Sequence, residues 1–86
     1  MKKKKILKYV EDYIPEEQIY LADGFEEAFL GIGQQFNNFF AVYDKNKCIE
    51  ILAKDMSFEE AQEYFDYNVV GAYLGENTPV FIDKIV

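Results

Sequence analysis

The sequence predicts a small α+β protein in which a small antiparallel sheet packs against helices. Its 86 residues suit one domain. Half of them are apolar and 17% are aromatic, which is enough for a core and too much for a disordered chain. Segments with helical spacing of apolar residues alternate with segments of period two. We therefore expect one domain over residues 1–86, with helices at about 4–14, 45–54 and 58–72, a hairpin at about 28–43 and a last strand at about 80–85.

The first helix is predicted from apolar residues at helical spacing, which are Ile6, Leu7, Val10, Tyr13 and Ile14. Pro15 ends this helix, because the residue before a proline is disfavoured in the helical conformation. Five of the nine lysines lie in the first eight residues. Because lysines at a helix N-terminus oppose the helix dipole, we expect residues 1–5 to be frayed.

The stretch ADGFEEAFLGIG, residues 22–33, contains three glycines and raises the question of a phosphate-binding loop. A dinucleotide loop needs a further glycine three residues after the second of its pair, and Phe36 stands there. The two glutamates and the aspartate of the stretch also have the wrong charge for a phosphate ligand. We therefore interpret the stretch as the beginning of a structural strand.

The strand is predicted from the period-two alternation that begins at Ala28. Asn37-Asn38 then predicts a tight hairpin turn, because asparagine tolerates left-handed backbone conformations. Gly31 and Gly33 would share one strand face with Phe29. We expect a helix or another backbone to approach closely where these two side chains are missing.

Two cap residues predict where the later helices begin. Asp44 is a good N-cap for the helix at about 45–54, and Cys48 falls on that helix among aliphatic neighbours, which indicates a buried thiol. Ser57 and Glu60 form a capping box for the next helix. The segment 69–74 is apolar on all sides, so it either continues this helix or forms a strand paired with residues 80–85. We favour the helix, followed by a turn before Val80.

The charge is unevenly distributed and limits the classes of partner. From Tyr9 onward there are sixteen acidic residues and four lysines. An acidic body disfavours direct binding of nucleic acid or of an anionic membrane, and it favours a basic protein partner or serves only solubility. No apolar run approaches the ~20 residues of a membrane span, and the basic start lacks the apolar segment of a secretory signal. A single cysteine excludes an internal disulfide and fits a reducing compartment, so we expect a cytoplasmic protein.

The candidate binding surface is the acidic side of the helix after Ser57. Glu59, Glu63 and Asp66 form a stripe on that helix, with Glu60 and Tyr67 beside it. Tyrosine is enriched in protein interfaces, so we predict that these five residues bind a protein partner. Two alternatives stay open: the carboxylates could imitate the phosphates of a nucleic acid and block an enzyme that binds it, or they could form an ordinary solvated face. A homo-oligomer that uses the aromatic residues is also possible.

The residue inventory argues against catalysis. Histidine is absent, the only serine is explained by its cap, and zinc sites need four ligands that are typically cysteine or histidine. We predict no enzyme activity and no cofactor. The alternative is a carboxylate-based, metal-dependent enzyme, for which Asp23, Glu26 and Glu27 are the candidate oxygen ligands.

Three stretches carry a resemblance to a known family: DGFEEAFLGIG, AVYDKNKCIEIL and MSFEEAQEYFDYNVVGAYLGENTPVFI. Over about residues 22–82, the chain resembles a family of small phage-encoded proteins of unassigned function. The resemblance brings no catalytic residues. It implies a phage or prophage product in a bacterial host cell, which binds and modulates a host or phage protein. Such a protein would act as an inhibitor or as a component linked to a defence system.

Overall fold

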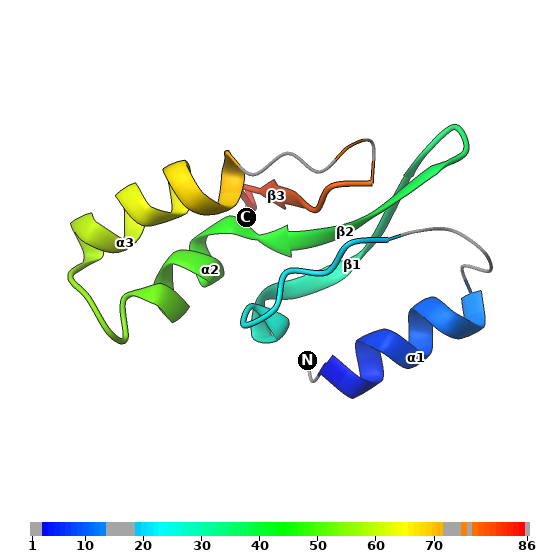
Figure 1. Ribbon diagram of the computed structural model, residues 1–86, viewed down its shortest axis with the longest axis horizontal. Helices are drawn as coiled ribbons and strands as arrows, with labels where there is room; N and C mark the ends of the chain where they lie inside the picture. Colours follow the sequence, from blue (N-terminus) through cyan, green and yellow to red (C-terminus); the bar gives the residue numbers. More distant parts are fainter. Residues whose placement is uncertain (1–2, 14–18, 72–74, 76, 86) are drawn as a thin grey trace.

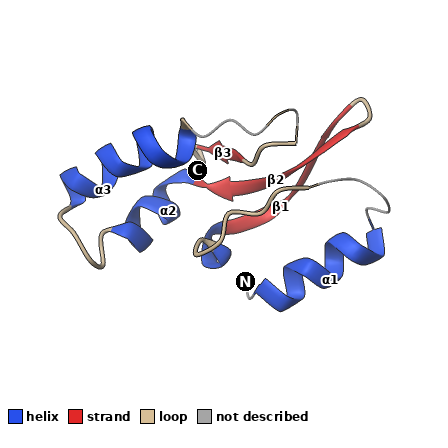
Figure 2. Cartoon of the chain, in the orientation of Figure 1, coloured by secondary structure: helices blue, strands red, loops and turns tan. Residues whose placement is uncertain are grey.

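The computed structural model describes residues 3–13, 19–71, 75 and 77–85. The helix α1 (Lys3–Tyr13) is followed by a short 3-10 helix η1 (Glu26–Ala28) and the hairpin strands β1 (Phe29–Gln35) and β2 (Asn38–Asp44). The chain continues through α2 (Lys45–Leu52), α3 (Phe58–Tyr64), a π-helical turn η2 (Phe65–Val70) and β3 (Val80–Ile82). Helices α2 and α3 lie side by side at one end of the molecule, and the hairpin turn projects at the other end (Figures 1 and 2). The predicted α+β class is confirmed.

The sheet is mixed, with the strand order β1-β2-β3. Strands β1 and β2 are antiparallel as predicted, whereas β3 runs parallel to β2, so the prediction of an all-antiparallel sheet is wrong for β3. The physical reason is the crossover through α2, α3 and η2, which returns the chain to the starting end of β2. Parallel neighbours require such a long connection.

The hairpin turn lies one residue before the predicted position. Gln35 pairs with Asn38, so Phe36 and Asn37 form the two-residue turn. Phe36 adopts a left-handed backbone conformation with φ 55°. The side-chain Nε2 of Gln34 donates a hydrogen bond of 2.9 Å to the carbonyl oxygen of Phe36. In this register Gly33 pairs with Phe40, whose ring occupies the space that a side chain at position 33 would fill. The neighbour at Gly33 is therefore a ring on the adjacent strand and not the helix or backbone that we expected, and a Cβ at Gly31 would meet nothing within 4 Å.

A β-bulge near the start of β1 changes which residues face the core. Phe29 pairs with Tyr43 and Gly31 pairs with Val42, which leaves Leu30 as the extra residue. Leu30 is exposed, whereas Phe29 is buried and Ile32 packs against the core. The alternation predicted from Ala28 is therefore interrupted at Leu30.

An aromatic cluster around Tyr43 forms the centre of the core. The ring of Tyr43 lies 5.6 Å from that of Phe29 and 5.7 Å from that of Phe81, between ring centroids. Phe65 contacts Phe81 edge to face at 5.1 Å, so the π-helical turn is joined to β3. The backbone N–H of Ala22 donates a hydrogen bond of 2.9 Å to the Tyr43 hydroxyl, which connects the segment before η1 to the sheet.

The helix starts agree with the predicted caps. The Asp44 side chain accepts from the Lys47 N–H at 3.3 Å, and the Ser57 hydroxyl accepts from the Glu60 N–H at 3.1 Å. Lys3, Lys4 and Lys5 lie within α1, where the sequence predicted a frayed end.

The other ends differ from the predicted bounds by a few residues. Helix α2 ends at Leu52, two residues early, and β3 ends at Ile82, three residues early. Residues 69 and 70 continue the helical path of α3, which agrees with the favoured interpretation of that segment. Residues 72–74, and with them the predicted helix end at residue 72, lie outside the described residues. Among the helices that the structure describes, none is long and apolar enough to cross a bilayer.

Candidate functional site: an acidic and tyrosine face on α3 and η2

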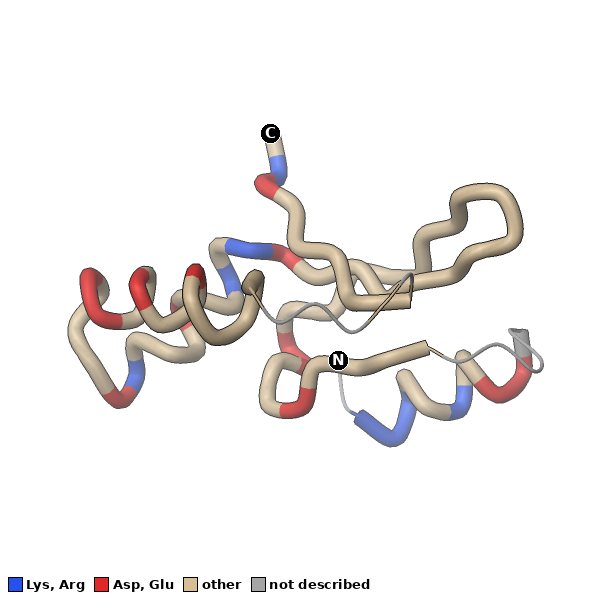
Figure 3. The backbone as a smooth tube through the Cα atoms, turned by 45° about the horizontal axis from the view of Figure 1, so that its top comes forward, with Lys and Arg blue, Asp and Glu red and all other residues tan. Residues whose placement is uncertain are grey.

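The predicted binding residues lie together on the continuous helical segment formed by α3 and η2. All five of them (Glu59, Glu60, Glu63, Asp66 and Tyr67) are exposed, and Tyr67 is 82% exposed. Figure 3 shows the carboxylate-bearing positions of this segment spaced along the helix at the end of the molecule opposite the hairpin turn. The opposite side of the segment is anchored, because Ala61 and Phe65 are fully buried.

Three of the five residues line a shallow hollow of about 370 Å³. The lining consists of Met56, Glu60, Glu63, Tyr64, Tyr67 and Asn68. Glu59 and Asp66 are exposed but do not belong to this lining. Tyr64 was not among the predicted binding residues, although its spacing of four residues from Glu60 and three from Tyr67 places it on their side of a helix. We call Glu60, Glu63, Tyr64 and Tyr67 the acidic-tyrosine face.

The carboxylates of the acidic-tyrosine face are available to a partner. The ion pairs of the described residues join Lys3 to Asp23 and Lys8 to Asp12, and neither involves α3 or η2. The cap at Ser57 orders the first turn of α3, on which Glu60 lies. Tyr67 and Asn68 lie on the π-helical turn, a widened geometry that is frequent at functional sites.

The candidate metal ligands are not brought together. The Asp23 Oδ1 lies 2.9 Å from the Lys3 Nζ, and the hydrogen bond and charge of Asp23 raise the pKa of Lys3. The Glu26 Oε2 accepts a hydrogen bond of 2.7 Å from the backbone N–H of Gly24, and Glu27 is exposed. Within the part of the chain that the structure describes, no three Cys, Asp or Glu side chains are grouped to hold a metal ion.

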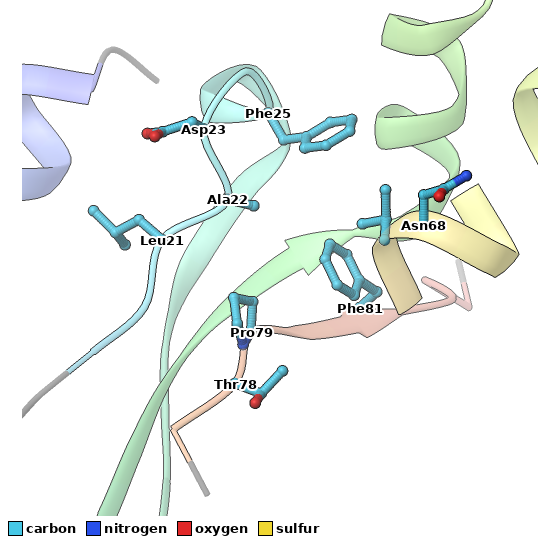
Figure 4. Close-up of a pocket in the computed structure, with 9 residues that line it drawn as sticks. Leu21, Ala22, Asp23, Phe25, Asn68, Thr78, Pro79 and Phe81 are labelled. Carbon is cyan, nitrogen blue, oxygen red and sulfur yellow. The ribbon is translucent and has the colours of Figure 1, made fainter. Parts of the chain in front are cut away.

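A second cavity, of about 200 Å³, lies between the segment before η1, the end of η2 and β3 (Figure 4). Its lining is mainly apolar, with Leu21, Phe25, Pro79 and Phe81 as the larger members. Asp23 belongs to the lining, but its carboxylate points away from Phe25 and Phe81 (Figure 4). The described lining therefore supplies rings and aliphatic surface, and its carboxylate is directed toward the ion pair with Lys3.

Cys48 is a structural residue, as the sequence predicted. Cys48 lies on α2, and its side chain is fully buried. Burial raises the pKa of the Cys48 thiol to about 12, and the nearby charge of Asp44 acts in the same direction. Because the thiolate is the nucleophilic form, this thiol is unreactive in the folded protein at neutral pH.

No protein-family model matches this chain, and no curated protein or solved structure was found to be significantly similar to it.

Proposed function

We propose that this protein is a non-catalytic acidic binding protein whose acidic-tyrosine face docks a basic protein. One observation carries the proposal: two carboxylates and two exposed tyrosines meet around one hollow on a helical segment that is anchored from behind. Glu59 and Asp66 add negative charge beside the hollow. The surface thus combines electrostatic attraction with the large, rigid contact area that tyrosine supplies.

The chemistry of the hollow suits a lysine or arginine side chain of the partner. A guanidinium can form charge-assisted hydrogen bonds with carboxylates such as Glu60 and Glu63. The same cation is attracted to the face of a tyrosine ring, such as that of Tyr64 or Tyr67. An arginine on the partner is therefore the expected central contact.

The resemblance to small phage-encoded proteins supports a setting for this interaction. We propose that the partner is a host or phage protein in the bacterial cytoplasm, and that binding modulates or inhibits it. A component of a defence system is one such partner.

The test compares variants of equal charge change. Wild-type protein, E60K/E63K and the control E11K/E50K are used as bait in host lysate, with bound proteins quantified by mass spectrometry. Glu11 and Glu50 are exposed on other helices, so the control changes the net charge equally and leaves the hollow intact. We expect a specific partner whose recovery falls about tenfold with E60K/E63K and is retained with the control. Equal loss with both variants would show that only net charge matters and would refute the assignment to this face.

The purified partner then separates the remaining alternatives. Binding to the wild-type protein should weaken as salt is added, because the contact is between opposite charges. Displacement of the partner by duplex DNA or RNA would identify the face as a nucleic-acid mimic. A melting temperature that rises with Mg²⁺ in the wild type and not in Asp23→Asn would support the metal-dependent enzyme instead.

A further inference from the structure

Helix α1 is attached to the rest of the protein through few of its side chains. Among those that the structure describes, Ile6 is buried and Val10 is half-buried, whereas the others are exposed. No other described helix or strand packs extensively against α1. Figure 1 shows α1 at the edge of the molecule, away from α2 and α3. One buried aliphatic side chain is a small anchor for a helix of eleven residues.

An exposed ion pair supplies a second attachment. The Lys3 Nζ lies 2.9 Å from the Asp23 Oδ1, and the two side chains are 53% and 76% exposed. Asp23 lies in the turn before η1, so the pair joins the first turn of α1 to the segment that leads into β1. Because water and salt screen an exposed ion pair, this attachment is weak and depends on ionic strength.

Helix α1 and the rest of the chain carry charges of opposite sign. The helix contains four lysines and two acidic residues, whereas residues 14–86 contain fourteen acidic residues and four lysines. Figure 3 shows the lysines of α1 on the first part of the helix. Longer-range attraction between the helix and the acidic body therefore favours docking, and this attraction also weakens as salt is added.

The packing between α1 and the start of β1 is incomplete. A hollow of about 200 Å³ at this junction is lined by Lys5, Tyr9, Phe29, Leu30 and Gly31. Leu30 is the extra residue of the β-bulge, and Gly31 has no side chain to fill the space. The unfilled space removes dispersion contacts that would otherwise hold the helix against the strand.

We propose that α1 is a detachable strap, which undocks as one unit while the sheet, α2 and α3 stay folded. Undocking withdraws Ile6 from the core and frees the carboxylate of Asp23. The aromatic cluster around Tyr43 contains no residue of α1, so the body keeps the centre of its core when the helix leaves. Because the ion pair and the longer-range attraction are both screened, ionic strength sets how often the strap is released.

The experiment is native-state hydrogen exchange of the full chain, followed for each amide by NMR. We expect the amides of residues 7–12 to share one protection factor, at least about tenfold below those of β2. Equal protection of α1 and β2 would overturn the proposal, because it would mean that α1 opens only when the whole chain unfolds. A gradient of protection along α1, in place of one shared value, would indicate fraying and would also overturn it.

Two variants of equal charge change test the ion pair. Lys3→Glu places a like charge beside Asp23, and the control is Lys4→Glu, since Lys4 is exposed and forms no ion pair with the described residues. Both variants put a glutamate in the first turn of α1, so their effects on the helix dipole are matched.

At about 50 mM NaCl, we expect Lys3→Glu to lower the protection of α1 about threefold or more below that of the control. The charge swap Lys3→Glu/Asp23→Lys should restore it. The difference between the two single variants should disappear near 500 mM NaCl, where the protection of α1 in the wild type should also be lower. Equal effects of the two single variants, or protection that does not change with salt, would overturn the release of the strap by ionic strength. None of these measurements depends on the acidic-tyrosine face.

Discussion

The buried thiol of Cys48 predicts a specific loss of stability at alkaline pH. In the folded protein its pKa is about 12, compared with the ordinary value of 9.0 that applies once the chain unfolds. Between these values the folded state keeps the proton and the unfolded state releases it. Each pH unit in that window therefore lowers the free energy of unfolding by about 1.4 kcal/mol. Below the ordinary value both states are protonated, and the contribution of the thiol is fully retained.

The assay is urea unfolding followed by circular dichroism at about pH 8, 9 and 10, for the wild type and Cys48→Ala. The alanine variant has no thiol to titrate. The free energy of unfolding of the wild type, relative to that of Cys48→Ala, should therefore fall by about 1–1.5 kcal/mol from pH 8 to pH 10. Burial also raises the pKa of the Tyr43 hydroxyl, with the Ala22 N–H opposing, but this contribution is common to both proteins. Parallel pH profiles would refute the reasoning, since they would mean that the thiol titrates alike in both states.

Three further substitutions test contacts that hold the fold together. Tyr43→Phe removes the hydroxyl that accepts the hydrogen bond from the Ala22 N–H, and it should lower the free energy of unfolding by about 1 kcal/mol. An unchanged free energy of unfolding would mean that water replaces the hydroxyl as the acceptor. Ser57→Ala removes a helix cap and should cost about 1 kcal/mol with reduced helicity in circular dichroism, unlike the conservative Ser57→Thr. Gly33→Ala places a methyl group where the ring of Phe40 lies and should cost about 1–3 kcal/mol, and a neutral effect would show that the ring moves aside freely.

Local signals in the sequence were sufficient for the elements that depend on near neighbours. Asp44 and Ser57 begin helices as predicted, because a cap needs only the backbone N–H three residues later. Period-two alternation located the hairpin, and the aliphatic neighbours of Cys48 indicated a buried thiol. The acidic side of α3 was also predictable, since helical spacing alone places Glu60 and Glu63 on neighbouring parts of one surface.

The features that depend on distant segments were settled only by the tertiary structure. The parallel direction of β3 follows from a crossover through two helices and the π-helical turn, and no residue within Val80–Ile82 encodes it. The bulge at Leu30 and the turn at Phe36 follow from the register that buries Phe29 and Tyr43 together. By itself, the sequence determined where the main helices and the hairpin lie and where the charge lies, because both are properties of neighbouring residues. Packing decided strand direction, register and the composition of the hollows, because each depends on side chains that meet only after the chain has folded.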